Sequence, residues 1–511
     1  MIAAEPIVLE SYLAGKWVRG DGEGAALVDP ATGETVARAS SDGLDLAGAL
    51  RYAREIGGPA LRRLSFAERA ELLGKIADVL AARKDEWHEI ARRNSGNTPA
   101  DAAIDVDGAI GTLKYFAKTG AALGSASFLA DGGPQRLARD ANFQGLHIGV
   151  PIDGVAIHIN AYNFPSWGLW EKAAVALLAG VPVVAKPATA TAWLAVAMTR
   201  AVTDAGILPD GALSIIAGSA GDLLLFVKFG DALAFTGSSE TGETIREHPH
   251  VRGENIRVNV EADSLNASLL GPDAAPGTPV FDLFVREVVR EMTTKAGQKC
   301  TAIRRALVPA AFADAVVAAI SSALDAAPEV APVVSPSSRD AVEAGIRALQ
   351  EAATLVYRRR HGADEKAAYV APALFRADGD VPVVHDAEIF GPVATVVTYR
   401  DPAEAYALAR RGGGSLVASV FSADPAFLAA SAAALGASHG RVLLVDPSIG
   451  ESHTGHGIVL PSCLHGGPGR AGNGEELGGL RGLWFYHQRT AVQGPAPVLA
   501  ELASRAVEIA R

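Results

Sequence analysis

The stretch from residue 154 to residue 262 constrains the fold of this 511-residue chain most, because apolar runs and helical segments alternate along it. The apolar runs predict buried strands at 154–159, 182–187, 213–218, 232–237 and 256–262. The segments between them predict helices at 166–180, 189–204, 219–228 and 238–247. Such alternation is typical of a parallel sheet covered by helices on both faces. We therefore expect an α/β fold.

The remainder of the chain extends this organisation on both sides. A second α/β region is expected at 266–445, with strands near 267–271, 305–309, 393–399, 416–421 and 441–446. Before the first region, short strands are expected within 8–40 and two amphipathic helices within 60–93. The polar, turn-rich stretch at 128–150 does not continue these helices. We expect it to form an arm or hairpin that extends from the body.

Composition excludes several classes of function. The chain has 46 basic and 57 acidic residues, a formal charge of −11, and no dense basic stripe, which argues against nucleic acid or an anionic membrane as partner. Two cysteines cannot build a disulfide framework, and the N-terminus lacks the pattern of a signal peptide. The uncharged apolar runs at 173–185 and 187–199 are shorter than the roughly 18 residues of a membrane span. These features predict a cytoplasmic protein.

Cys300 is the first candidate for chemistry. It follows a helical pattern at 280–292 and a Gly-Gln break, so its thiol is expected on an irregular segment where a backbone N–H stands free beside it. Most lone cysteines are small buried hydrophobes, and that is the alternative interpretation. The motifs described next favour a chemical role for Cys300 over this alternative.

Two motifs indicate a phosphate-bearing ligand. FTGSSETG puts Gly237 and Gly242 between a predicted strand and a helix N-terminus, where backbone N–H groups and the helix dipole favour a phosphate. A plain tight turn is the alternative. Lys186 ends the strand of PVVAKP, at the edge where open parallel sheets usually bind ligands, although a solvated lysine is also common there.

Two polar residues close to predicted strand ends are candidates for catalysis. Glu261 is the one ionisable residue of VNVEA, so its buried carboxylate must be ion-paired or have a raised pKa suited to a general base. Asn163 lies in YNFP just past a strand, and its amide could donate to an oxyanion. Taken by itself, Glu261 could instead be part of an internal ion pair, and Asn163 could simply be a turn residue.

Together these motifs resemble the aldehyde dehydrogenase superfamily, over roughly residues 10–495. The matching segments, in the order and approximate spacing of that family, are NAYNFPSW, VVAKP, FTGSSETG, VEADSLN, GQKCTAIRR, EIFGPV and ELG. Within the superfamily the chain is most similar to the dehydrogenases that act on CoA-linked semialdehydes in benzoate and phenylacetate degradation.

The resemblance implies a fold and a domain organisation. A Rossmann-type dinucleotide-binding domain is expected at 1–127 and 150–262, and an α/β catalytic domain at 263–470. A small β element for oligomerisation is expected at 128–149 and 471–511. A homodimer, or a dimer of dimers, is the implied assembly.

The resemblance also implies the catalytic roles. Cys300 would attack the aldehyde as a thiolate, and the Asn163 side chain with the Cys300 backbone N–H would hold the oxyanion. Glu261 would activate the water that hydrolyses the resulting thioester. Lys172 and Glu476 match a suggested proton path behind the general base, with an internal ion pair as the alternative. No metal ion is expected in this site.

The cofactor residues follow from the same motifs. Glu388 and Phe390 of EIFGPV match contacts to the nicotinamide ribose and ring. Lys186 matches an adenosine-ribose ligand and Ser238 a pyrophosphate contact. Many relatives carry a glutamate where this chain has Thr189, and that glutamate would repel the 2′-phosphate of NADP. NADP is therefore the predicted cofactor, with the Thr189 hydroxyl expected to donate to the phosphate.

Two competing functions stay open. A CoA-acylating dehydrogenase would resolve the thioester with CoA, although a water-activating Glu261 argues against this. A catalytically silent dinucleotide-binding protein would keep the fold without the reaction, although the joint presence of Cys300, Asn163 and Glu261 argues against that.

Overall fold

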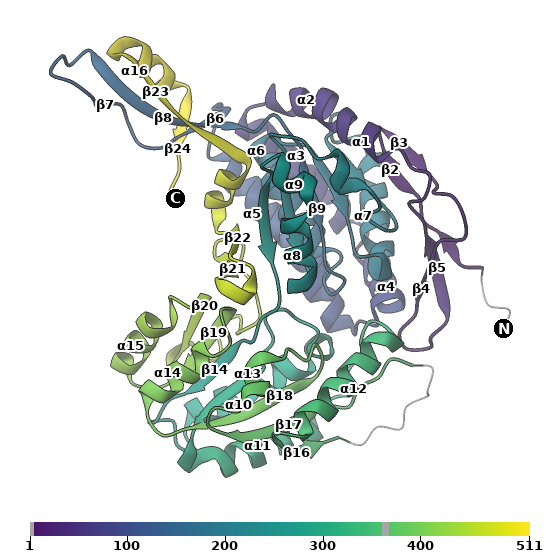
Figure 1. The fold of residues 1–511 in the computed structure, drawn as a ribbon, viewed down its shortest axis with the longest axis vertical. Coiled ribbons are helices and arrows are strands. Elements are labelled where there is room, and N and C mark those ends of the chain that lie inside the picture. The colour runs from purple at the N-terminus through teal and green to yellow at the C-terminus, as the bar shows by residue number, and fades with distance from the viewer. Residues whose placement is uncertain (1–4, 360–366, 511) are drawn as a thin grey trace.

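The computed structural model describes residues 5–359 and 367–510, which form two α/β lobes and a projecting arm (Figure 1). Residues 1–4 and 511, which were expected to begin and end the domains, and residues 360–366 lie outside the described part. Each lobe is built on a seven-stranded sheet. The two sheets correspond to the two α/β regions expected from the sequence, so the expected fold class is confirmed.

The first sheet contains five parallel strands and an antiparallel hairpin at one edge. In spatial order its strands are β13 (Arg257–Glu261), β12 (Ala232–Thr236), β9 (Ala156–Ile159), β10 (Val183–Lys186), β11 (Leu213–Ile215), β2 (Ser11–Leu13) and β3 (Lys16–Val18). The five parallel strands lie where the apolar runs predict them.

Helices cover both faces of this sheet, because successive side chains of a strand point to opposite faces. Val183 packs into one core and its neighbour Val184 into the other. One face is covered by α3 (Phe66–Ala81), α5 (Pro99–Ala121), α6 (Trp167–Ala179) and α7 (Ala192–Asp204), with α4 (Lys84–Ser95) against α5 and α7. The other face is covered by α1 (Leu46–Tyr52), α8 (Ser239–Glu247) and α9 (Pro249–Gly253).

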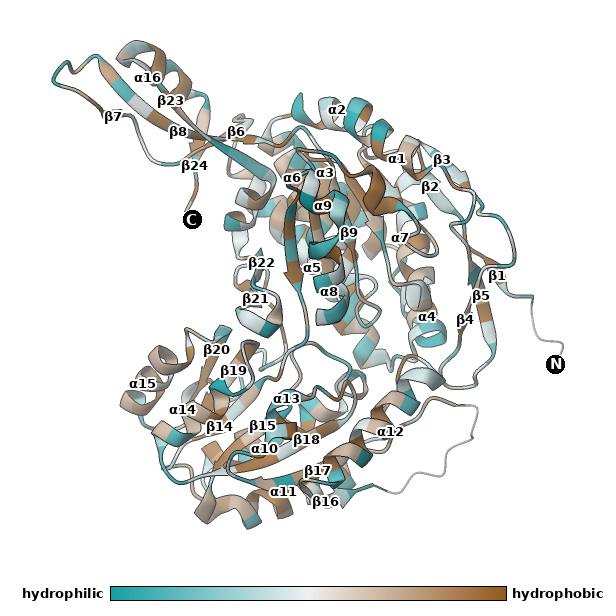
Figure 2. Ribbon diagram, viewed as in Figure 1, coloured by the Kyte–Doolittle hydropathy of each residue, from teal (hydrophilic) through white to brown (hydrophobic). Residues whose placement is uncertain are grey.

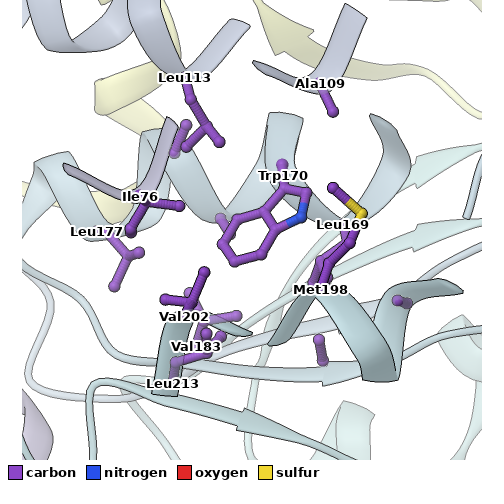
Figure 3. Packing of buried hydrophobic residues seen from close by; sticks show 14 of the residues in the cluster. Ile76, Ala109, Leu113, Leu169, Trp170, Leu177, Val183, Met198, Val202 and Leu213 are labelled. Carbon is purple, nitrogen blue, oxygen red and sulfur yellow. The ribbon is translucent and has the colours of Figure 1, made fainter. Parts of the chain in front are cut away.

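α6 is buried on all sides between the sheet and the outer helices. Figure 3 shows Trp170 at its centre, with Ile76 and Leu113 of the outer helices on one side and Val183 and Val202 on the other. The helix ends at Gly180, whose φ of +85° is a left-handed conformation that favours glycine. A helix packed this tightly gives a rigid base to any polar residue on it.

The second sheet is also mostly parallel, with β16 antiparallel at one edge. Its strands, in spatial order, are β16 (Thr354–Arg358), β17 (Ala373–Asp378), β18 (Val393–Tyr399), β15 (Arg305–Pro309), β14 (Ala267–Leu270), β19 (Ser415–Phe421) and β20 (His439–Val445). One face is covered by α10 (Pro279–Thr293) and α11 (Ala313–Ala326). The other is covered by α12 (Pro336–Gln350), α13 (Pro382–Asp386), α14 (Pro402–Arg410) and α15 (Pro425–Leu435).

Hydropathy follows this layering. Figure 2 shows apolar residues concentrated in central strands such as β9 and β18 and polar residues on the outer surfaces of helices. None of the helices in the described residues combines the length and the apolar character that crossing a bilayer requires.

The arm consists of two segments that are far apart in sequence. β8 (Phe143–Pro151) pairs antiparallel along its whole length with β23 (His487–Pro495). β6 (Phe128–Ala130), β7 (Gln135–Arg136) and β24 (Ala506–Glu508) complete the sheet, and α16 (Ala496–Ser504) packs on it. The predicted pairing of 128–150 with the C-terminal segment is confirmed. Residues 474–486, however, pack against α6 rather than in the arm.

Three smaller features lie outside the two large sheets. A separate small sheet contains β1 (Ile7–Val8), β4 (Ala25–Val28) and β5 (Thr35–Ala39), and a short helix, α2 (Gly58–Arg62), precedes α3. A hairpin of β21 (Leu464–Gly467) and β22 (Gly474–Leu477) lies between the lobes (Figure 1). The predicted helix at 219–228 is wrong, because only a 3₁₀ turn forms at Leu223–Phe226. Gly221 is left-handed, with a φ of 47°, and Val227 is extended, so the backbone leaves the helical conformation on both sides of this turn.

Candidate active site

The carboxyl ends of four parallel strands meet at one edge of the first sheet. The strand register pairs Lys186 with Ile159 and Thr236 with Glu261, and each of these is the last residue of its strand. Open parallel sheets bind ligands at this edge. The sequence motifs built on Lys186, Gly237 and Glu261 therefore converge on one region.

The segment that leads to Cys300 has an unusual backbone. After α10, Lys295 and Ala296 have φ values of 51° and 52°, a left-handed conformation that costs non-glycine residues free energy. The Lys295 N–H donates to Oδ1 of Asp101, on α5, at 2.7 Å. Asn266 donates its side-chain amide to the Cys300 carbonyl at 2.8 Å. Contacts from Asp101 on α5 and from Asn266 therefore position the segment that carries the thiol.

Cys300 opens into a cavity of about 650 Å³ that we call the front cavity. Its walls are mostly apolar and include Ile104, Phe164, Trp167, Ile458 and Val459. Burial, and the charge of Glu261 next to it, raise the pKa of the Cys300 thiol well above its usual range. The thiol is therefore protonated at neutral pH.

Asn163 lies against the same loop. Its side-chain Nδ2 donates to the Gln298 carbonyl at 3.1 Å, two residues before Cys300, and the side chain is nearly buried. An amide nitrogen carries two hydrogens, so this bond leaves one donor for another acceptor. The structure thus brings the predicted amide beside the predicted nucleophile.

Glu261 is paired with a histidine. Its Oε2 lies 3.0 Å from Nε2 of His465, on β21, and both side chains are 2% exposed. Burial alone would raise the pKa of Glu261, but the charge of His465 and its hydrogen bond outweigh burial and lower it to about 2. Of the two predicted possibilities, a paired carboxylate or a raised pKa, the structure has the paired carboxylate, with His465 as its partner. Glu261, Cys300 and His465 have their polar atoms within 4.8 Å of one another.

A second group of charges lies on the other side of Glu261. Nζ of Lys172 is 2.7 Å from Oε1 of Glu171 and 2.9 Å from Oε2 of Glu476. Carboxylate oxygens of Glu171, Glu261 and Glu476 lie within 4.8 Å of one another. Burial raises the pKa of Glu171 well above its usual range. Lys172 and Glu476 therefore form a buried ion pair behind Glu261, in a cluster that includes a third carboxyl group.

A smaller cavity of about 310 Å³, which we call the rear cavity, borders this charge cluster. Its walls are rich in polar side chains, among them Asn259, Tyr486 and the members of the cluster. The Asn259 amide donates to Oε1 of Glu476 at 3.2 Å, which holds that carboxylate in place.

The residues predicted to bind adenosine lie on β10 and just after it. Burial lowers the pKa of Lys186, and the lysine forms no ion pair within the described residues. Such a half-buried cation suits an anionic ligand. Thr189 differs from the prediction, because its hydroxyl donates to the Gly218 carbonyl at 2.7 Å. Its single O–H donor is therefore already used and does not face a phosphate.

The two glycines of FTGSSETG have different roles. Gly237 lies in the turn between β12 and α8, where an added Cβ would lie 2.5 Å from the Phe235 ring. Gly242 was predicted in this turn, but it lies inside α8, and its N–H donates to the Ser238 carbonyl. An added Cβ there would lie 3.0 Å from Val260, so Gly242 allows close packing of the helix on β13. Ser238 is the N-cap of α8.

Glu388 and Phe390 approach the site from the second lobe. Oε1 of Glu388 lies 3.5 Å from Nη2 of Arg304, and Oε2 accepts from the Ser264 N–H at 3.1 Å. Burial raises the pKa of Glu388 to about 7 although Arg304 opposes this. The Phe390 ring meets Tyr162 edge-on at 5.9 Å, one residue before Asn163.

Comparison with known proteins decides which family this arrangement represents. A model of the aldehyde dehydrogenase family matches residues 17–492. The chain belongs to the aldehyde dehydrogenase family. It is 50% identical over 481 residues to the 3,4-dehydroadipyl-CoA semialdehyde dehydrogenase of Aromatoleum evansii, covering 90% of this chain and 93% of that protein. It is 31% identical over 432 residues to an α-ketoglutarate semialdehyde dehydrogenase of Haloferax volcanii, covering 81% of this chain and 86% of that protein.

Solved structures confirm the fold of this aldehyde dehydrogenase. The γ-glutamyl-γ-aminobutyraldehyde dehydrogenase of Burkholderia cenocepacia J2315 superposes with a TM-score of 0.83 at 23% identity, over 96% of this chain and 97% of the other. As a member of the family, the protein is an oxidoreductase that acts on aldehydes and binds NAD or NADP.

The sequence reasoning missed two residues of this aldehyde dehydrogenase site. His465 lies in a glycine-rich stretch with no spacing pattern that would connect it to Glu261. Glu171 had a usable signal, because Glu171 and Lys172 are the only charged residues of an otherwise apolar predicted helix. Two adjacent charges inside a fully buried helix predict a compensating acid or base from another element.

Proposed function

We propose that this aldehyde dehydrogenase oxidises a CoA-linked semialdehyde, 3,4-dehydroadipyl-CoA semialdehyde, to the carboxylic acid with NADP. The name of the 50% identical relative supports this substrate. The observation that carries the reaction type is that Cys300 lines the front cavity with its sulfur within 4.8 Å of the Glu261 carboxylate, while the Asn163 amide bonds to the same loop. The apolar walls of that cavity suit the carbon chain of a semialdehyde.

In the first step Cys300 attacks the aldehyde carbon as a thiolate and forms a thiohemiacetal. The free amide hydrogen of Asn163 and the Cys300 backbone N–H hold the developing oxyanion, at about 3 kcal/mol for each donor. A bound nicotinamide dinucleotide supplies the hydride acceptor that turns this adduct into a thioester. Because the pKa of Cys300 is raised, the thiol is protonated before the reaction, and it releases its proton to solvent as the C–S bond forms.

In the second step Glu261 takes a proton from the water that attacks the thioester. The C–S bond then breaks, the acid leaves, and Cys300 regains its proton. Lys172 and Glu476 lie directly behind Glu261, so they are suited to exchange this proton with the rear cavity. We assign them that role in preference to a purely structural ion pair, because a carboxylate oxygen of Glu476 lies within 4.8 Å of one of Glu261.

The carboxyl edge of the first sheet suits the dinucleotide. Lys186 would contact the adenosine ribose, and Ser238, which follows the tight turn at Gly237, would contact the pyrophosphate. Glu388 would accept hydrogen bonds from the nicotinamide ribose and Phe390 would contact the ring. Gly242 supports this site indirectly, because it lets α8 pack closely on β13.

The preference for NADP rests on the residue at position 189. A glutamate there would put a negative charge against the 2′-phosphate, whereas Thr189 is neutral and Lys186 supplies a positive charge close by. Because the Thr189 hydroxyl bonds to Gly218, we attribute the preference to the missing repulsion and not to a new hydrogen bond. We expect kcat/KM to favour NADP over NAD by ten- to a hundredfold, which corresponds to about 1.4–2.8 kcal/mol.

Thr189→Glu tests this preference. The variant should reverse or erase it, and Thr189→Val should keep it because it also lacks a charge. A wild-type enzyme that prefers NAD would refute the assignment.

The experiment that tests the function is an assay of the purified protein with the CoA-linked semialdehyde and NADP. The expected product is the free acid with one NADPH for each aldehyde. A CoA-acylating enzyme would instead form a new thioester from a simple aldehyde and added free CoA, and mass spectrometry of the products distinguishes the two. If a panel of aldehydes yields no NADPH, the chain is a catalytically silent dinucleotide-binding protein.

We further propose how the lobes and the arm are used. The first lobe (1–127 and 150–262) would bind the dinucleotide, and the second (263–470) would supply the nucleophile. The arm exposes Leu137, Phe143 and Val498. We expect these apolar side chains to contact a second copy of the chain in a homodimer or dimer of dimers. Light scattering of a Phe143→Glu, Val498→Glu variant should show dissociation to smaller species.

A further inference from the structure

Lys295 is a buried cation without a contacting counter-charge. Three lysines are buried in the described part of the chain, Lys172, Lys295 and Lys299. The ammonium groups of Lys172 and Lys299 each lie 2.7 Å from a carboxylate oxygen. Nζ of Lys295 instead donates to Oδ1 of Asn97 at 3.1 Å, and it forms no ion pair within the described residues. An unpaired buried charge costs stability, so its presence points to another use.

The backbone of Lys295 belongs to the loop that holds the predicted oxyanion donor. The Lys295 carbonyl accepts from the Gln298 N–H at 2.9 Å, and the Gln298 carbonyl accepts from Nδ2 of Asn163 at 3.1 Å. These three residues also border one cavity of about 270 Å³, which we call the side cavity. The lysine therefore belongs to the immediate surroundings of the amide that would bind the oxyanion.

Phe164 connects the ammonium group with the substrate site. Nζ of Lys295 lies 4.7 Å from the centroid of the Phe164 ring, a distance at which the ring face attracts a cation. Phe164 follows Asn163 in the sequence and lines the front cavity together with Cys300. The same ring is thus in contact with the ammonium group and with the cavity in which the aldehyde would react.

Two aspartates of α5 favour the charged form of this lysine. Burial lowers the pKa of Lys295, whereas the charges of Asp105 and Asp101 raise it. Oδ1 of Asp101 also accepts from the Lys295 N–H at 2.7 Å and so supports the left-handed backbone at this residue. The side chain is therefore suited to carry a charge although it is buried.

Negative groups lie on the other side of the nucleophile. The charges of Glu261 and Glu388 both raise the pKa of the Cys300 thiol. The same two charges would disfavour an oxyanion on the carbon that is bonded to the sulfur. Hydrogen-bond donors at this oxygen therefore act against an opposing field, which a cation next to the Asn163 loop would offset.

We propose that the ammonium group of Lys295 stabilises the oxyanion through Asn163 and the Phe164 ring, so that Lys295 is a positioning residue for both reaction steps. The inference rests on the proposed function. As the sulfur bonds to the aldehyde carbon, the C=O π electrons move to the oxygen and the thiol proton leaves to solvent. Transfer of hydride to the bound dinucleotide then restores the C=O bond. When water bonds to the thioester carbon, an oxyanion forms again at the same place.

Lys295→Met and Lys295→Gln test the proposal. Both remove the charge, and the glutamine keeps a donor for Oδ1 of Asn97. We expect the burst of NADPH that accompanies acylation and the steady-state rate to fall together by roughly ten- to a hundredfold, less than the loss of a direct oxyanion donor costs. Loss of the general base would slow only the second step. Dinucleotide affinity should change less than about twofold, which also shows that the variants are folded.

A tetrahedral analogue separates the effect of charge from that of structure. A straight-chain trifluoromethyl ketone forms the same kind of adduct with Cys300, but its reacting carbon carries no hydrogen, so the reaction stops there. Its inhibition constant should rise by the factor by which the burst rate falls. The corresponding secondary alcohol forms no bond to sulfur, and its inhibition constant should change less than about twofold.

Several outcomes would overturn the inference. If ketone and alcohol binding weaken equally, Lys295 is merely structural. Unchanged ketone binding in both variants would show that its charge does not reach the oxyanion. Ketone binding that is lost in Lys295→Met but complete in Lys295→Gln would assign the effect to the hydrogen bond with Asn97 and not to the charge.

The matched control is the double variant Lys299→Met, Glu291→Gln. It removes another buried lysine of the same segment together with the carboxylate that balances its charge. The ratio of ketone to alcohol binding should stay within about twofold of the wild type. A selective loss of ketone binding in this control would refute a specific role for Lys295. A wild-type protein that forms no NADPH from any aldehyde would overturn the proposed function itself.

Discussion

The front and rear cavities differ in kind, and Glu261 lies within 4.8 Å of a lining residue of each, His465 of the front cavity and Glu476 of the rear one. The front cavity has apolar walls, and Cys300 and His465 are its only titratable lining residues among those described. The rear cavity is bordered by Glu171, Lys172 and Glu476 and holds a much smaller volume. The apolar walls of the front cavity suit the carbon chain of a substrate. The closely spaced carboxylates beside the rear cavity can accept a proton from one another. The difference indicates that substrate and protons use separate routes to the same carboxylate.

The largest expected effect comes from the residue on which both routes depend. Cys300→Ala should lower aldehyde oxidation by at least ~10⁴-fold, because no other group can form the thioester. Dinucleotide affinity, measured by fluorescence titration, should change less than about twofold. Cys463→Ala, which removes the other cysteine, should keep full activity. Turnover in the Cys300 variant would refute covalent catalysis.

Substitution of the shared carboxylate separates the two steps. Glu261→Gln should form the acyl-enzyme with a burst of about one NADPH for each site, and steady-state turnover should fall by roughly 10²–10⁴-fold. Rapid-mixing absorbance measures both phases. Loss of the burst would mean that Glu261 also activates the thiol, and full activity would remove it from the mechanism.

The rear charge cluster should be sensitive to loss of its cation. Lys172→Met leaves Glu171 and Glu476 buried without a counter-charge, and we expect the free energy of unfolding to fall by about 3–5 kcal/mol at pH 8. The loss should be smaller at pH 5, because the two carboxyl groups can then take up protons. Chemical denaturation at both pH values measures this. The control is Lys75→Met, which breaks the exposed pair with Glu71 and should cost less than about 1 kcal/mol.

The smallest effect is expected at the front wall. Ile458→Asn introduces an amide into an apolar lining, and we expect KM for the semialdehyde to rise about tenfold while the NADPH burst persists. The acid limb of the pH profile should stay in place. A change in deacylation rate with unchanged KM would show that the two cavities are not separate in function.

Strands and the glycine turn at Gly237 could be predicted from the sequence, because each leaves a local signal, whereas the role of Cys300 as nucleophile stays a prediction. Buried strands are continuous apolar runs, and the turn that needs Gly237 follows one of them directly. The helix predicted at 219–228 failed for a physical reason. Its leucines suggest a helix, but Gly221 is left-handed and Val227 is extended, and the composition of the segment does not reveal these backbone conformations.

Apart from the pairing in the arm, which the family resemblance implied, contacts between distant segments could not be predicted. His465 meets Glu261 only because the β21–β22 hairpin folds against the end of β13, and no spacing encodes that approach. The Thr189 hydroxyl was expected to face a ligand, yet it bonds to Gly218 on a neighbouring loop. Side-chain donors usually take a nearby backbone carbonyl when one is within reach.

The pairing of β8 with β23 has a consequence for synthesis of the chain. The two strands are separated by about 340 residues, so β8 leaves the ribosome long before its partner exists. At about 5–20 residues per second, the edge of β8 that later binds β23 waits roughly 20–70 s. An open strand edge is a template for pairing with other chains. During this interval the nascent protein is most exposed to aggregation, and a chaperone that covers residues 143–151 would protect it.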